Sequence, residues 1–382
     1  MGVYLDYNAS APVDDRVIET MVNVYRNCFG NSDSRTHIFG ENARIVVEDA
    51  RKQVASLLNV SSDEVFFTSG ATESNNIAIR GLQEYALKTG KKHIITTTIE
   101  HKAVLETAKH MALTGFDVDF VSPDNSGRVS FEEIVSKLRP DTLLVSVMHV
   151  NNETGIIQPV KEIGEYLAKT EILFHVDATQ SCGKLVEEIK ALNYNMLSFS
   201  AHKLMGPQGV GVLVLKKKGF KRLPVKAISY GGQQESGIRP GTVPVALVAG
   251  CGKACEIAED EYGVNGENAK EIKKIVLEEI DRSGLDYSIN GDQQYCVDST
   301  LSVSLKGISS EALMIAAKQY CGISNGSACT SKSYSPSYVL VAMGIPEEEI
   351  EGSVRLSWGP YTKIEDVKTN IRELLRVAKD MI

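Results

Sequence analysis

The stretch Ile172-Leu173-Phe174-His175-Val176-Asp177 is a short apolar run that ends on a carboxylate. Similar apolar runs recur along the first two-thirds of the chain, with amphipathic helical stretches between them. Near-continuous apolar strands that alternate with helices are typical of a mostly parallel sheet covered on both faces. Ligands of such sheets bind beyond the carboxyl ends of the strands, where Asp177 is expected to lie. The other predicted strands are residues 65–68, 93–98, 118–121, 143–149, 196–199 and 210–215.

The helical stretches are recognised by apolar side chains that recur on one face. After a long helical region at residues 243–281, the pattern changes to strands mixed with a single helix. We therefore expect an α/β fold with a large domain of residues 15–263 and a smaller α+β domain of residues 1–14 and 264–382. Helices are predicted at residues 41–58, 104–113, 131–138, 160–169 and 311–320, and the late strands at residues 287–289, 300–305 and 353–357.

The composition is ordinary for a globular protein, with 382 residues and a formal net charge of −8. This charge argues against a broadly basic surface, so no direct nucleic-acid binding is expected. No apolar run reaches the roughly 18 residues of a membrane helix, and the first residues lack a signal-peptide pattern. The seven cysteines are scattered without a Cys-x-x-Cys pair, which argues against a disulfide framework and a zinc site. A cytoplasmic protein without a bound metal is the default expectation.

Lys203 stands out because it lies between two strand-like runs rather than among polar residues. An amine in an apolar pocket has a lowered pKa and can attack a carbonyl carbon. A nearby carboxylate, here Asp177, is the group that keeps a pyridinium nitrogen protonated. The two residues together suggest a pyridoxal 5'-phosphate site, with Lys203 as the Schiff-base lysine. Most single lysines are only solvated charges, so this interpretation depends on the rest of the chain.

Residues 66–75 run from an apolar strand through Gly70 into a helix that begins near Ala71 and Thr72. A helix start offers free N–H groups to a phosphate, although an ordinary capped helix fits the same residues. His101 follows the strand at 93–98 and could stack on a cofactor ring, or be a plain loop histidine. Asn152 lies in a turn that follows another strand and offers an amide to a ligand oxygen.

Cys329 lies in the polar stretch Ser324-Asn325-Gly326-Ser327-Ala328-Cys329-Thr330-Ser331. An accessible thiol in a segment with few apolar anchors can collect a group at one place and deliver it at another. The alternative is an incidental loop thiol. Arg355 follows in a short strand near the C-terminus, where its guanidinium suits either a substrate carboxylate or a structural ion pair.

Together these segments closely resemble the cysteine desulfurases of the NifS/IscS type, a family of class V, fold-type I pyridoxal-phosphate enzymes. The resemblance covers essentially the whole chain. It implies a fold-type I architecture and a conversion of L-cysteine to L-alanine, with the sulfur passed to an enzyme cysteine as a persulfide. The segments that carry it are residues 4–6, 69–75, 100–101, 151–155, 177–180, 200–203, 241–242, 326–331 and 355–359.

The resemblance also implies a role for each matched residue. Lys203 binds the cofactor and moves protons at the substrate α-carbon, while Cys329 attacks the substrate sulfur. Asp177 pairs with the pyridinium nitrogen, Gln180 meets the ring hydroxyl and His101 stacks on the ring. Asn152 and Arg355 take up the substrate carboxylate. The phosphate is held by Ala71, Thr72, Ser200 and His202, with Thr242 coming from the partner subunit of an obligate homodimer.

The chain departs from the family pattern at three places, none of which touches the chemical residues. Residues 332–336 replace a loop that commonly carries a Leu-Glu pair before proline, Pro240 stands where serine or alanine is usual, and residues 31–34 lack the common proline. The first change lies where a sulfur-acceptor or scaffold protein would dock. Iron–sulfur cluster assembly, tRNA thiolation and DNA phosphorothioation are therefore all open as destinations. A selenocysteine lyase, an aminotransferase and an inactive docking scaffold are the alternative functions.

Overall fold

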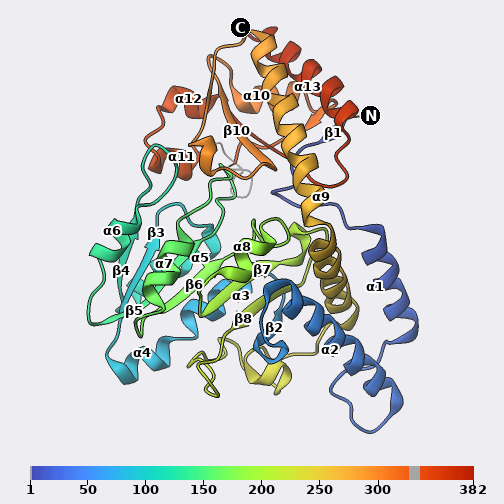
Figure 1. Ribbon diagram of the computed structural model, residues 1–382, viewed down its shortest axis with the longest axis vertical. Helices are drawn as coiled ribbons and strands as arrows, with labels where there is room; N and C mark the ends of the chain where they lie inside the picture. Colours follow the sequence, from blue (N-terminus) through green and yellow to red (C-terminus); the bar gives the residue numbers. More distant parts are fainter. Residues whose placement is uncertain (1, 327–335) are drawn as a thin grey trace.

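The computed structural model describes residues 2–326 and 336–382 and is built around a seven-stranded sheet (Figure 1). Neighbouring strands are parallel, except that β8 runs antiparallel to both of its neighbours, β2 and β7. The predicted α/β class with a mostly parallel sheet is confirmed. The strands in spatial order are β2 (Val65–Thr68), β8 (Gly211–Leu215), β7 (Met196–Ser200), β6 (Leu173–Asp177), β5 (Thr142–Met148), β3 (His93–Thr97) and β4 (Asp117–Val121).

Both faces of this sheet are covered because its central strands are apolar on both sides. In β8, Val212 and Val214 join one hydrophobic core, whereas Leu213 and Leu215 join the other. The first core lies under α2 (Ile38–Leu58) and the start of α9 (Val245–Ser283), and the second lies under α3 (Ala71–Arg80) and α5 (Lys102–Leu113). The remaining helices of this part are α1 (Asp15–Asn27), α4 (Gln83–Thr89), α6 (Phe131–Ser136), α7 (Val160–Leu167) and α8 (Val186–Ala191).

A separate hydrophobic core forms around a second, smaller sheet, in the part drawn in orange and red in Figure 1. The long helix α9 contributes to the first core through Ala246 and to this separate core through Ile272. The division into two domains, with boundaries at residues 14 and 263, stays a prediction. The elements around this core are the antiparallel strands β12 (Ser353–Ser357), β10 (Thr300–Leu305) and β9 (Tyr287–Ile289), the parallel pair β1 (Val3–Tyr4) and β11 (Cys321–Gly322), and the helices α10 (Ser310–Ala316) and α13 (Ile364–Lys379). The short helices α11 (Tyr338–Ala342) and α12 (Glu347–Glu351) place their buried residues in the first core.

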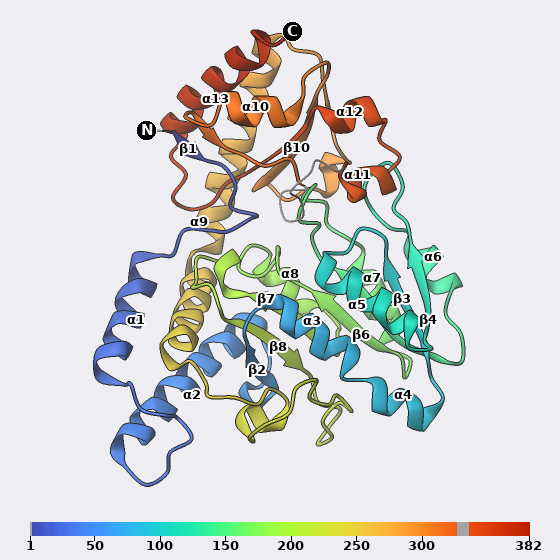
Figure 2. The same ribbon diagram turned by 180° about the vertical axis from the view of Figure 1, so that it is seen from behind.

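The N-terminal segment joins the two parts of the molecule, as the blue trace in Figure 2 shows. Its residue Leu5 is fully buried in the smaller core, and β1 pairs with β11 there. The chain then passes the carboxyl ends of the central strands before α1 begins at Asp15, capped by the Asp14 side chain. Within the described residues, no helix combines the length and apolar character needed to cross a membrane.

Candidate active site

Asp177 is the last residue of β6 and is buried at the carboxyl end of the sheet. Its carboxylate accepts hydrogen bonds from Asn75 Nδ2 at 2.7 Å and from the backbone N–H of Thr179 at 3.0 Å. Two donors on different elements fix the carboxylate in one orientation. The group is therefore placed to meet a cation or a protonated ring nitrogen beyond the strand.

Lys203 ends the short 3-10 turn that follows β7, and its side chain is part-buried. Its Nζ donates to the carbonyl oxygens of Asn8 and Ala9, both at 2.6 Å. Gln180 Nε2 donates to the same Asn8 oxygen at 3.0 Å. The two predicted residues thus converge on one backbone carbonyl of the N-terminal segment, which the sequence interpretation did not include.

The turn before α3 lies close to the end of β7. Ala71, the first residue of α3, donates its N–H to Ser200 Oγ at 2.7 Å. Gly70 has φ +155°, and a Cβ on the neighbouring Gly211 would lie 2.5 Å from its Cα, so small residues are needed both in this turn and at the start of β8. This close approach keeps the start of α3, with Thr72 exposed beside it, clear of bulky side chains.

Two histidines beside this turn are held as neutral rings. His202 Nδ1 lies 3.2 Å from Ser10 Oγ, and burial together with the Lys203 charge lowers its pKa to about 4. His101 caps α5, where its Nδ1 accepts the Ala103 N–H at 3.1 Å, and burial also lowers its pKa. A neutral ring can stack on a flat ligand without carrying a charge.

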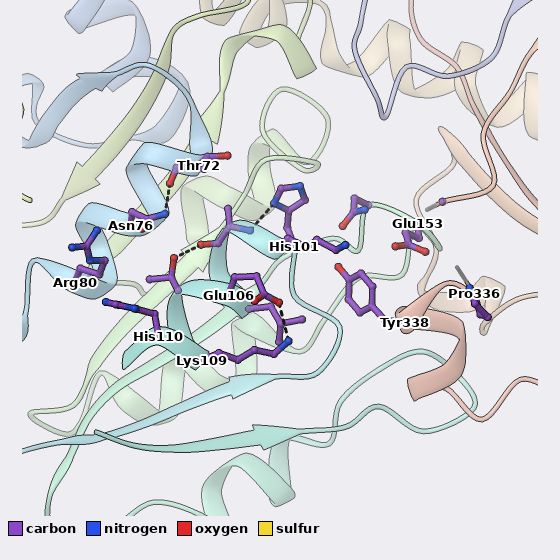
Figure 3. A pocket seen from close by; sticks show the side chains of 16 residues that line it. Thr72, Asn76, Arg80, His101, Glu106, Lys109, His110, Glu153, Pro336 and Tyr338 are labelled. Atoms are coloured by element: carbon purple, nitrogen blue, oxygen red, sulfur yellow. Dashed lines mark hydrogen bonds and ion pairs between the residues drawn. The ribbon is translucent and has the colours of Figure 1, made fainter. Parts of the chain in front are cut away.

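His101, Thr72 and Asn152 line a cavity of about 830 Å³ (Figure 3). Lys203 instead lines a smaller cavity of about 180 Å³, together with Tyr7 and Lys184. The backbone carbonyls of Asn8 and Ala9 hold the Lys203 side chain at the smaller cavity, whereas His101 lines the larger cavity. The predicted residues therefore surround one sheet edge from two sides.

Arg355 is buried and makes the ion pair that the sequence left open as an alternative. Its Nη2 donates to Asp6 Oδ1 at 2.6 Å, and its Nη1 donates to the Asn152 carbonyl oxygen at 2.9 Å. Burial raises the pKa of Asp6, and the Arg355 charge opposes that shift. Asp6 belongs to a segment quoted only for its resemblance, so its contact with Arg355 was missed.

Several buried polar atoms at this edge have no hydrogen-bond partner among the described residues. A buried polar atom of this kind is costly unless a ligand or water meets it. The amide oxygens can accept from a ring hydroxyl or an N–H group, whereas the hydroxyl, the guanidinium N–H and the helix start can donate to a phosphate or a carboxylate. The residues present therefore fit pyridoxal phosphate with an attached amino acid. The atoms are Asn75 Oδ1, Asn152 Oδ1, Thr179 Oγ1, Gln180 Oε1 and Arg355 Nε.

Two buried glutamates next to the site were also missed by the sequence interpretation. Glu100 Oε1 accepts from the Met148 N–H and the Thr97 hydroxyl, both at 2.9 Å, and burial raises its pKa to about 8. Burial raises the pKa of Glu153 to about 7. Glu153 Oε2 accepts from Ser337 Oγ at 2.5 Å, and a Cβ on Gly326 would lie 2.6 Å from the same oxygen. Glu153 thus contacts residues on both sides of the segment 327–335.

Two predicted site residues are not part of this cluster. Cys329 lies outside the described residues. Thr242 is exposed, and it makes no hydrogen bond with the other predicted site residues within residues 2–326 and 336–382. Both roles stay predictions.

Comparison with known proteins decides the family. The aminotransferase class-V model matches residues 3–369. The chain belongs to this family. Among its relatives, the cysteine desulfurase IscS of Actinobacillus succinogenes is 43% identical, over 99% of this chain and 93% of the relative. A cysteine desulfurase of Pongo abelii is 39% identical, over 99% of this chain and 82% of the relative. The chain is accordingly one of the cysteine desulfurases.

Solved structures agree with this assignment. A NifS-like protein superposes with a TM-score of 0.91 at 36% identity, covering 100% of both chains. DndA of Streptomyces lividans gives a TM-score of 0.81 at 42% identity, covering 92% of this chain and 98% of that one. SspA in complex with cysteine gives 0.82 at 35% identity, covering 94% and 100%. The fold-type I architecture expected from the sequence is confirmed.

Proposed function

We propose that this cysteine desulfurase uses pyridoxal 5'-phosphate to convert L-cysteine to L-alanine and receives the sulfur on Cys329 as a persulfide. The observation that carries the proposal is the convergence of Asp177, Gln180 and Lys203 at one sheet edge, among buried polar atoms that lack partners. A structural relative solved with cysteine supports the choice of substrate.

The residues that would hold the cofactor are those at the carboxyl ends of β6 and β7 and at the start of α3. Lys203 would bind the aldehyde carbon, Asp177 the ring nitrogen and Gln180 the ring hydroxyl, while His101 stacks on the ring. When bound, pyridoxal phosphate withdraws electrons from the α-carbon of an attached amino acid. The phosphate would be held by Ala71, Thr72, Ser200 and His202, with Thr242 from the partner subunit of a homodimer.

Arg355 and Asn152 would bind the substrate carboxylate. The guanidinium already has one hydrogen bond to Asp6 and one to the Asn152 carbonyl, so its plane is fixed before substrate arrives. Its Nε has no partner within the described residues and offers one N–H to a substrate carboxylate oxygen. This arrangement orients the amino acid before any bond changes.

Sulfur transfer requires a base at the α-carbon and a thiolate at the sulfur. Lys203 is the amine placed to take and return the α-proton. The Cys329 thiolate forms a new S–S bond as the substrate Cβ–S bond breaks. The electron pair of that bond leaves with carbon, which is then protonated to give L-alanine. A persulfide is a sulfur donor, so delivery to an acceptor or scaffold protein follows.

The destination of the sulfur, the homodimer and the cytoplasmic location stay predictions. Iron–sulfur cluster assembly, tRNA thiolation and DNA phosphorothioation remain the three candidate uses.

The proposal is tested by alanine formation from L-cysteine with and without added keto acids. A desulfurase needs a reductant to clear its persulfide but no keto acid, so keto acids should not change the rate. Cys329→Ala should keep the cofactor absorbance and lose the sulfur release, whereas Cys28→Ala serves as the matched control. A strict requirement for a keto acid would indicate an aminotransferase instead.

A further inference from the structure

The segment from Gln233 to Thr242, here called the Thr242 arm, follows β8 and leads into α9. It contains the short 3-10 turn η3 (Gln234–Gly237). Glu235 and Ser236 in this turn have φ of +47° and +54°. Non-glycine residues reach this left-handed region at an energetic cost, so such a turn persists only where its surroundings hold it.

The Glu235 carboxylate fixes this turn in place. It is 3% exposed and forms a bidentate ion pair with Arg51 of α2, with N–O distances of 2.8 and 2.9 Å. Its Oε2 also accepts the Phe67 N–H of β2 at 2.8 Å. Arg51 in turn donates to the Val65 carbonyl at 2.6 Å and lies over the Phe67 ring. The carboxylate therefore has three hydrogen bonds to α2 and β2, which offset the cost of burying it.

A second ion pair holds the other end of the arm. Arg239 Nε lies 3.2 Å from Glu73 Oε1, and Glu73 Oε2 accepts the Ser69 N–H at 2.5 Å. Gln234 Oε1 accepts the Gly241 N–H at 3.0 Å, which closes the arm on itself. Both anchors attach to residues 65–73, the segment that leads into and begins the helix whose start faces the proposed phosphate site.

Thr242, at the far end of the arm, is exposed although the arm is anchored by a buried charge pair. The proposed function has this exposed hydroxyl meet the cofactor phosphate of the partner subunit.

We propose that Glu235 is a positioning residue, which with Arg51 fixes the Thr242 arm so that Thr242 reaches the cofactor phosphate in the partner subunit. This inference rests on the proposed function, because it requires a shared pyridoxal-phosphate site in a homodimer. The effect of Glu235 should be larger in the partner's site than in the site of its own chain, where Glu235 contacts only Phe67 of β2 ahead of the start of α3.

Hybrid dimers distinguish an effect of Glu235 on the partner's site from an effect on the site of its own subunit. One subunit carries Lys203→Ala, so only the other holds the cofactor through a lysine. Glu235→Gln is then placed either on the Lys203→Ala subunit or on the intact one. The measured quantity is the dissociation constant of pyridoxal phosphate at the site with the intact Lys203. It is obtained from the absorbance of the lysine-bound cofactor during a titration.

Glu235→Gln on the Lys203→Ala subunit should weaken cofactor binding at the intact site by about tenfold or more, since hydrogen bonds to a charged group are lost. The same substitution on the intact subunit should weaken the affinity less, because there it changes only the Phe67 contact ahead of the start of α3. Glu48→Gln is the matched control, because Glu48 is an exposed partner of the same Arg51 and does not touch the arm. Arg239→Ala, at the second anchor, gives a milder version should Glu235→Gln fail to fold.

A Thr242→Ala hybrid distinguishes failure of the inference from failure of the proposed function. If Thr242→Ala weakens the partner's site but Glu235→Gln and Arg239→Ala do not, the positioning role is wrong and the shared site stands. If Thr242→Ala has no effect across the dimer, the shared site and this inference are both wrong. An equal effect of Glu235→Gln in both placements would also overturn the inference.

Discussion

Two groups of residues meet at the site, and they are built in different ways. The sheet-edge group, with Asp177 and Lys203 as examples, comes from the ends of neighbouring strands and the turns that follow them. The assembled group, with Asp6 and Arg355 as examples, comes from segments 349 residues apart that meet only through tertiary packing. Asn8 connects the two, because its carbonyl accepts from Lys203 and its side-chain amide donates to the Asn152 carbonyl.

This difference suggests that the two groups bind different molecules. The sheet-edge group is fixed by strand register and would hold the cofactor. The assembled group depends on how the smaller core packs against the larger one, and would hold the substrate. Loss of a sheet-edge residue should therefore impair turnover, whereas loss of an assembled residue should impair substrate binding.

The largest effect is expected at the sheet edge. Asp177→Asn keeps the shape of the side chain but removes the negative charge that would stabilise a protonated ring nitrogen. We expect kcat for alanine formation to fall by about a hundredfold to a thousandfold at saturating cofactor. Asn75→Ala removes one hydrogen bond to the same carboxylate and should cost much less. Wild-type turnover in Asp177→Asn would contradict the claim that the sheet-edge group is needed for turnover.

A smaller effect, seen mainly in KM, is expected in the assembled group. Arg355→Lys loses the planar guanidinium and should raise KM for L-cysteine by about tenfold to a hundredfold, with a lesser change in kcat. Asp6→Asn should raise KM less, because it weakens only the contact that orients Arg355. Steady-state kinetics measures both constants. The exposed Arg372→Lys serves as the control, and a pure kcat effect of Arg355→Lys would contradict the assignment.

The smallest effect concerns stability, at Glu100 behind the sheet edge. Burial raises its pKa from 4.5 to about 8, so the folded protein holds a proton that the unfolded chain releases. This contribution to stability is full below pH 4.5 and is lost as the pH rises towards 8, with a slope on the order of 1 kcal/mol per pH unit. Denaturant unfolding of the apoprotein at pH values from about 5.5 to about 8 measures this loss of stability.

Glu100→Gln should flatten this pH dependence, since the amide cannot titrate. A slope that is identical in the variant and the wild type would show that Glu100 is not the group responsible.

The sequence allows the sheet-edge group to be predicted because each of its residues lies beside a local pattern. Asp177 ends an apolar strand, Lys203 follows one, and Ala71 begins a helix after a glycine turn. The bond from Asp6 to Arg355 could not be predicted, because it depends on how the N-terminal segment packs between two cores. The burial of Glu153 could not be predicted from the sequence either, since it comes from contacts with Gly326 and Ser337.

Helix lengths show the same limit. Residues 311–320 were predicted as one helix, but α10 ends at Ala316. The Tyr320 and Cys321 N–H groups both bond to the Ala317 carbonyl, and this turn directs the chain into β11 beside β1. Pairing with an N-terminal strand that lies far away in the sequence therefore ends the helix early.

The most direct test of the account is to locate the sulfur on the protein after reaction with L-cysteine. Mass spectrometry of peptides from the wild-type enzyme, taken after a brief incubation without reductant, should show one added sulfur atom on the peptide that carries Cys329. Cys321 is buried with its Sγ near the Asn370 carbonyl, and burial raises its pKa to about 12, so its peptide should stay unmodified. Added sulfur on another cysteine, or alanine formed with no sulfur on Cys329, would contradict the account.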